Sequence, residues 1–176
     1  SQRPLLLLPL KMIVDPKQSF RHQAQPERSL KSRAVAYLSR REHSRAELAQ
    51  KLSPFESDAS VVEALLDQLA AQGWQSDERF VANTVNAKAS RQGRALIEQS
   101  LRQKGVDKAL IETLASTLGP TEVVRATEVW QRRFGLKPAD STSQGYAKQA
   151  RFLLSRGFQP ETVRKVLAKQ RDQSLD

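Results

Sequence analysis

The chain has 176 residues and a formal net charge of +10, with 29 Lys and Arg against 19 Asp and Glu. This charge favours a polyanionic or acidic partner, of which nucleic acid is the commonest. The chain contains no cysteine, which excludes disulfides, thiolate metal sites and thiol nucleophiles. Apolar residues recur at helical spacings, whereas the alternation typical of strands is poorly supported, so an all-α protein is predicted.

The N-terminal segment "PLLLLPLKMIV" has the composition of a signal peptide's apolar core. It is short, Pro4 and Pro9 interrupt it, and no small-residue cleavage site follows. No segment approaches the roughly 18 apolar residues that a membrane span requires. We therefore expect residues 1–28 to be a poorly ordered tail, with a short docking peptide as the alternative, and the protein to be cytoplasmic without a membrane partner.

An internal repeat divides the rest of the chain. A shift of 49 places overlays Leu52 on Leu101 within a longer apolar register, and a further shift of 52 overlays Leu101 on Leu153 and Gly105 on Gly157. The second register decays upstream of Leu101, so the third copy is the weaker one. Matching apolar positions at a fixed period predict an elongated stack of units, none of which covers its own hydrophobic face.

Each unit is predicted to contain three helices. The expected ranges are 29–41, 45–52 and 59–72 in repeat 1 (29–75), 78–91, 94–104 and 108–118 in repeat 2 (76–118), and 120–134, 144–156 and 160–171 in repeat 3 (119–171), followed by a C-terminal tail (172–176).

The stretch "REHSRAELAQKL" places a histidine, a serine and a carboxylate close together, as a catalytic site would. Ser44 followed by Glu47 is, however, the pattern of a reciprocal capping box at a helix start, and His43 then precedes the cap. We expect the stretch to begin a helix and to carry no catalysis.

Other helix boundaries follow from glycine, proline and aspartate. Glycines after apolar segments are predicted to end helices in the left-handed conformation, prolines to occupy first turns, and aspartates to cap helix starts. The residues concerned are Gly73, Gly105, Gly119, Gly157, Pro120, Pro160, Asp77 and Asp107.

Catalytic motifs are missing from the sequence. It has no glycine-rich phosphate loop, HExxH motif, EF-hand loop or nucleophile elbow, so no enzyme, cofactor or metal site is predicted. The larger aromatic residues fall on or beside apolar stripes and are expected in the core: Trp74, Phe80, Trp130, Phe134, Phe152 and Phe158.

Positive charge gathers at the end of each first helix and along each second helix, while third helices carry more acid. Equivalent helices of a stack line up, so one basic edge is expected, although lysine and arginine also simply solubilise exposed helices. Arginine predominates there, which suits bidentate contacts to carboxylate or phosphate. The candidate contacts to a protein or DNA partner are Arg45, Lys51, Arg91, Arg94, Arg102, Lys104, Arg151 and Arg156.

The chain resembles RecX, the bacterial regulator of the RecA recombinase, in four segments that follow in the family's order: "REHSRAELAQKL", "VVEALLDQLAAQGWQSDERFV", "LRQKGVD" and "ARFLLSRGFQPETVRKVL". The resemblance covers about residues 30 to 169. It implies a curved array of three tandem three-helix repeats that binds, as a monomer, in the groove of the RecA–DNA filament. It also implies inhibition of RecA's ATP hydrolysis, strand exchange and stimulated repressor cleavage, with no catalytic residues.

Two features of the chain depart from the family pattern. The segment "KLSPFESDAS" replaces the lysine–glycine–aromatic turn usual in the family, and the N-terminal leucine segment has no recognised counterpart. The alternative function is that of a helix-turn-helix-like protein that binds duplex DNA directly. The second helices lack the Asn, Gln and Arg cluster that reads base edges, which disfavours this alternative. In either case, the basic surface is expected to contact DNA non-specifically.

Overall fold

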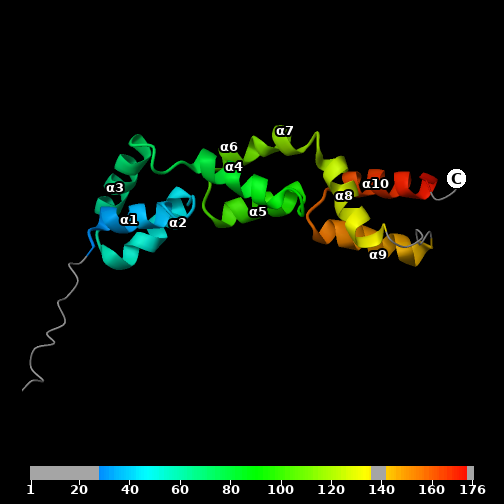
Figure 1. Ribbon diagram of the computed structural model, residues 1–176, viewed down its shortest axis with the longest axis horizontal. Helices are drawn as coiled ribbons and strands as arrows, with labels where there is room; N and C mark the ends of the chain where they lie inside the picture. The colour runs from blue at the N-terminus through cyan, green and yellow to red at the C-terminus, as the bar shows by residue number, and fades with distance from the viewer. Residues whose placement is uncertain (1–27, 136–141, 174–176) are drawn as a thin grey trace, which may run out of the picture.

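The computed structural model describes residues 28–135 and 142–173, which form an elongated array of helices without strands (Figure 1). Repeat 1 contains α1 (Leu30–Leu38), α2 (Arg45–Leu52), the 3-10 turn η1 (Ser53–Phe55) and α3 (Ala59–Ala71). Repeat 2 contains α4 (Asp77–Lys88), α5 (Arg94–Gln103), α6 (Lys108–Glu112) and α7 (Leu114–Leu118). Repeat 3 contains α8 (Glu122–Phe134), α9 (Ser143–Ser155) and α10 (Pro160–Gln173). The predicted all-α fold of three tandem three-helix units is confirmed.

The predicted tails lie almost entirely outside the described residues. Of the N-terminal tail only residue 28 is described, and of the C-terminal tail only residues 172 and 173, which belong to α10. Within the array, α5 and α9 lie toward the lower side of Figure 1, whereas α6, α7 and α10 lie toward the upper side. Second and third helices therefore occupy different sides of repeats 2 and 3.

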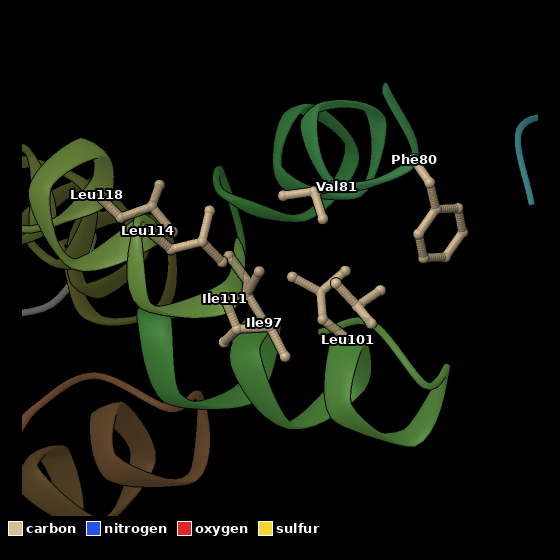
Figure 2. Close-up of a cluster of buried hydrophobic side chains, with 8 residues drawn as sticks. Phe80, Val81, Ile97, Leu101, Ile111, Leu114 and Leu118 are labelled. Carbon is tan, nitrogen blue, oxygen red and sulfur yellow. The ribbon is translucent and has the colours of Figure 1, made fainter. Parts of the chain in front are cut away.

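Each repeat has a hydrophobic core of its own. In repeat 2, Phe80 and Val81 of α4 pack with Ile97 and Leu101 of α5 and with residues of the third helix (Figure 2). Separate clusters occupy repeats 1 and 3. The expectation that a unit cannot cover its own hydrophobic face is therefore wrong, and the contacts between units are of another kind.

Three predicted helices differ clearly from those observed. The first helix of repeat 1 ends at Leu38, three residues before its predicted end. In the other two, side chains bind backbone carbonyls where the helix stops. The third helix of repeat 2 is interrupted at Thr113, whose hydroxyl donates to Leu110 O at 2.7 Å and competes with the helical ladder. Helix α4 ends at Lys88, three residues before its predicted end. The turn that follows α4 is held by Arg125, whose side chain donates to Ala89 O and Gln92 O. Long-range contacts of this kind have no local signal in the sequence.

Most predicted helix boundaries are observed. Ser44 caps α2 by accepting from Glu47 N, Asp107 caps α6, and Pro160 is the first residue of α10. Gly73, Gly105 and Gly157 have positive φ values, as a helix-terminating glycine requires.

Four boundary or core assignments were wrong. Ser76, not Asp77, caps α4; Pro120 precedes the observed N-cap of α8, Thr121; and Gly119 is not among the glycines with positive φ. Trp74 was expected in the core but is 46% exposed, whereas the other five predicted aromatics are buried or packed against a core cluster.

The capping box of α2 is only half formed. Ser44 accepts from Glu47 N at 3.1 Å, but the Glu47 carboxylate turns toward Arg41 and Lys104 instead of back to the cap. The Ser44 hydroxyl itself donates to Lys104 O at 2.5 Å. Both halves of the motif thus reach repeat 2, because the start of α2 lies against the end of α5.

The same contact joins repeats 2 and 3. Gly93 N, at the start of α5, donates to Arg156 O at 2.7 Å, and Ala95 N donates to Gly157 O at 3.1 Å. Gly93 is the 49-place equivalent of Ser44, and Arg156 is the 52-place equivalent of Lys104. At both junctions, therefore, the start of one second helix meets the end of the next.

A carboxylate from the following repeat completes each junction. Asp77 Oδ1 of α4 accepts from Arg45 N at 2.8 Å, and Glu122 Oε1 of α8 accepts from Arg94 N at 3.2 Å. Arg45 and Arg94 are again 49-place equivalents. Because the first amides of a helix have no partner within it, these carboxylates satisfy a donor at the positive end of each second helix.

Glycine is required where the second helices meet. A Cβ added to Gly157, which has a φ of +83°, would lie 2.7 Å from Leu96 N, a backbone atom that cannot move aside. Gly73 has a similar φ of +73° but nothing within 4 Å of such a Cβ. Comparing a substitution at Gly73 with one at Gly157 therefore distinguishes the free-energy cost of the left-handed backbone from the cost of a steric clash at the junction.

We predict that Gly157→Ala destabilises the protein more than Gly73→Ala. The Gly73 change costs about 1 kcal/mol for the left-handed conformation alone. The Gly157 change adds a steric cost of about 1–3 kcal/mol. Urea unfolding followed by circular dichroism measures both, and equal destabilisation would contradict the junction contact.

Candidate binding site

Two hollows lie at the two junctions, one at each. The first junction hollow has a volume of about 470 Å³ and is lined by Ala46, Glu47, Gln50, Lys51, Arg102, Gln103, Lys104 and Gly105. The second, which we call the arginine hollow, has a volume of about 460 Å³ and is lined by Arg91, Val129, Arg132, Arg133, Phe152 and Arg156. Five of the eight predicted contact residues line one or the other: Lys51, Arg91, Arg102, Lys104 and Arg156.

The first junction hollow contains its own counter-charge. The Glu47 carboxylate, 8% exposed, lies 2.7 Å from Arg41 Nη2 and 3.0 Å from Lys104 Nζ. The hydrogen bond from Arg41 outweighs burial, and with that from Lys104 lowers the pKa of Glu47 from 4.5 to about 2. Lys104 belongs to repeat 2, so this ion pair also links the first two repeats.

The other two cations of the first junction hollow are less constrained. Lys51 Nζ lies 5.2 Å from the centre of the Tyr37 ring, and Arg102 Nη1 lies 3.6 Å from Glu98 Oε2. The Arg102 side chain is 57% exposed, so its pairing with Glu98 contributes little and leaves the guanidinium available.

The arginine hollow has no counter-charge among the described residues. None of its four arginines forms an ion pair with a described carboxylate; Arg132 donates to Ser90 O, and Arg156 lies 5.1 Å from the centre of the Phe152 ring. Val129 and Phe152 add an apolar wall. This arrangement is suited to an anionic group.

The remaining predicted residues lie outside both hollows. Arg45 pairs with Glu63 at 2.5 Å and Asp67 at 2.8 Å, both on α3, and so neutralises part of the acidic third helix of its own repeat. Arg94 lies 3.2 Å from Glu98 on the same helix. Arg151 is exposed on α9. The basic edge is therefore less uniform than the sequence predicts.

Sequence reasoning left Arg132 and Arg133 out of the candidate contacts. Two arginines in the last turn of a helix also complement its dipole, so their presence in the sequence has an ordinary structural explanation. Only the packing of α8 beside the α4–α5 turn brings them near Arg91. The sequence nevertheless contains a hint. Arg132 and Arg133 follow Val129 by three and four residues, so all three side chains lie on one face of the helix.

No described group supports catalysis. His43 is buried, its Nδ1 lies 3.0 Å from Arg41 O, and burial lowers the pKa of its ring. The described ranges contain no group of three or more His, Cys, Asp or Glu side chains placed to hold a metal ion. Within the same ranges no helix has the length and apolarity that crossing a membrane demands.

Three family models match the three repeats in order. They are the first, second and third three-helix domains of RecX, which match residues 31–69, 76–114 and 121–167. Regulatory protein RecX of Leptothrix cholodnii is 49% identical over 142 residues, covering 81% of this chain and 89% of its own. Regulatory protein RecX of Ralstonia nicotianae is 44% identical over 139 residues, covering 79% and 86%.

Solved structures show the same fold. The crystal structure of RecX from Lactobacillus salivarius has a TM-score of 0.72 at 18% identity, covering 80% of this chain and 94% of its own. A second crystal structure, of regulatory protein RecX, has a TM-score of 0.67 at 22% identity and covers 79% and 71%.

Fold and junction contacts together define an all-α protein of tandem three-helix repeats, the kind of domain that all three matching models describe. More narrowly, the chain belongs to the RecX family, as its sequence motifs predicted.

We predict that acid weakens the first junction through Glu47. A carboxylate whose folded pKa lies below its unfolded value contributes stability above pH 4.5, and this contribution is lost as pH falls toward 2. The shift corresponds to at most about 3 kcal/mol. Glu47→Gln should therefore lower the free energy of unfolding at pH 7 and flatten its dependence on pH between 5 and 2.

The matched control is Glu112→Gln, which removes one exposed carboxylate from an i,i+4 pair on α6. Its effect on stability at pH 7 should be about 0.5 kcal/mol or less. Urea unfolding at a series of pH values compares the three proteins. A Glu47→Gln curve parallel to that of the parent would show that the Glu47 ion pair does not set the acid response.

Proposed function

We propose that this protein is a negative regulator of RecA that binds in the groove of the RecA–DNA filament. In this proposal it inhibits ATP hydrolysis, strand exchange and stimulated repressor cleavage. The observation that carries the proposal is the recurrence of exposed cations at equivalent junctions, Lys104 at one and Arg156 at the next, in a chain of the RecX family. A partner with a regularly repeated acidic or phosphate group fits such a surface.

Multivalency explains how such a surface acts without a tight individual site. The first junction hollow and the arginine hollow lie on one array, so binding at one raises the effective concentration at the other. Long-range attraction also speeds association with a polyanionic filament. The protein acts as a monomer in this proposal, since one chain already presents both sites.

The first experiment measures RecA's single-strand-dependent ATP hydrolysis while this protein is titrated in, with DNA in excess and salt near physiological. We expect ATP hydrolysis to be inhibited when the concentration of this protein is still well below the concentration of RecA. Simple competition for DNA cannot produce this result, because DNA remains in excess. An unchanged rate throughout the titration would overturn the proposed regulation.

Neutralising the first junction hollow should weaken this inhibition. In Lys51→Gln/Arg102→Gln, two cations that line the hollow are removed without disturbing the Glu47 ion pair. The concentration needed for half-inhibition should rise about tenfold, which corresponds to about 1.4 kcal/mol. Helicity measured by circular dichroism should be unchanged.

The control variant Lys108→Gln/Lys165→Gln removes the same charge from exposed positions on α6 and α10, outside both hollows. It should inhibit like the parent. If the two variants inhibit equally, the partner responds to overall charge and the assignment of the contact to the junction is wrong.

The second candidate function is direct binding of duplex DNA, which the basic surface also favours. It predicts tight binding to bare duplex without RecA, together with no effect on RecA's ATP hydrolysis. Weak binding to DNA that disappears as salt rises is compatible with the first proposal, because non-specific phosphate contacts are strongly salt-dependent.

A further inference from the structure

The two junctions join equivalent ends of the second helices but differ in their electrostatics. At the first junction, Glu42 pairs with Arg79 at 2.8 Å, and Glu47 pairs with Arg41 and Lys104. The 49-place equivalents of Glu42 and Glu47 at the second junction are Arg91 and Leu96. One carboxylate has become an arginine and the other an apolar residue.

Among the described residues, the second junction therefore gathers cations without the carboxylates that neutralise them at the first. Arg91 comes from the turn between α4 and α5, Arg132 and Arg133 from α8, and Arg156 from the end of α9. Three segments far apart in sequence thus present guanidinium groups to one hollow. Like charges within a Debye length of about 10 Å repel one another, so an anion that enters the hollow is stabilised by all four.

We propose that the arginine hollow is a binding site for a triphosphate group, carried by a nucleotide or free as inorganic polyphosphate. The hollow's volume of about 460 Å³ lies within the range of small-molecule sites, about 300–1,000 Å³. Guanidinium groups bind phosphate oxygens in a bidentate manner, and they keep their charge at any physiological pH. Four of them match the high charge of a triphosphate.

The four arginines around one hollow favour an anion of concentrated charge over a continuous strand. A nucleic-acid strand carries one negative charge per phosphate and has to enter and leave the site. A triphosphate places its charge within a few atoms, near all four arginines. Val129 and Phe152 offer an apolar wall to whatever group the triphosphate carries. This site overlaps the surface that the proposed regulation of RecA assigns to the filament. Its test is nevertheless separate, because triphosphate binding is measured without RecA or DNA.

The test uses the full chain alone, by isothermal titration calorimetry with ATP, inorganic tripolyphosphate, AMP and a single-stranded oligonucleotide with a 5′-hydroxyl end. ATP and tripolyphosphate should each saturate a single site, and AMP should bind much more weakly. Equal affinity for ATP and tripolyphosphate identifies the triphosphate alone as the ligand. Tighter binding of ATP shows that the nucleoside also contacts the apolar wall.

The variant Arg91→Gln/Arg133→Gln removes two of the four arginines, neither of whose side chains has a described hydrogen bond to the rest of the protein. It should weaken ATP binding about tenfold or more, because each arginine contributes charge-assisted hydrogen bonds. The control Lys148→Gln/Arg151→Gln removes the same charge from exposed positions on α9, outside the hollow, and should bind ATP within about twofold of the parent.

Two results would overturn the proposal. One is that both variants lose affinity equally, which would indicate general attraction to a basic protein. The other is that the oligonucleotide binds the parent while ATP and tripolyphosphate do not, which would make the hollow part of a DNA-binding surface. Neither result bears on inhibition of RecA, which is measured separately.

Discussion

Direct contact between the second helices of successive repeats is the constraint on which the rest of this structure depends. Each repeat folds around its own hydrophobic cluster, so buried apolar area does not hold one repeat in place relative to the next. Hydrogen bonds to the carbonyl at the end of the neighbouring second helix do so instead, from the Ser44 hydroxyl at the first junction and from Gly93 N at the second. A carboxylate on the first amide of each second helix supports them. Such bonds require close approach, which explains the glycine at the end of each joined second helix.

The same constraint explains why the first repeat departs from the pattern. The equivalent of Gly105 in repeat 1 is Glu56, which follows the 3-10 turn η1. Gly105 is needed because the Ala46 side chain of the preceding repeat lies where its Cβ would be. No described repeat precedes the first one, so no neighbour demands a glycine there. The irregular "KLSPFESDAS" segment thus marks an end of the described array.

Much of this fold was predictable from the sequence because its causes are local. Apolar periodicity, the Ser44 cap and the helix-ending Gly157 depend on residues a few positions apart, and these predictions hold. The interruption at Thr113 and the role of Asp77 were not predicted. Asp77 depends on an amide 32 residues earlier, with which it pairs only after repeats 1 and 2 have packed.

The sequence predicted that the candidate site is basic, but not which residues form it. Sequence reasoning found the basic residues of the second helices, and five of eight line a hollow. It could not show that Arg45 is neutralised by α3, nor that Arg133 lies with Arg91. The sequence shows how many positive charges the protein has. Which of them remain free to bind a partner depends on where the carboxylates lie, and tertiary contacts decide that.

Because both hollows are formed by two repeats, a ligand in either one also acts on the shape of the array. A group that contacts the end of one second helix and the start of its neighbour binds best at one relative orientation of the repeats, and stabilises that orientation by its differential affinity. At the first junction the Glu47 ion pair already provides such a link within the protein. At the second junction the equivalent position is Leu96, so the anion proposed for the arginine hollow would take the role that Glu47 has in the first. Under this proposal, ligand binding would fix the relative orientation of repeats 2 and 3, whereas the Glu47 ion pair fixes that of repeats 1 and 2 without a ligand.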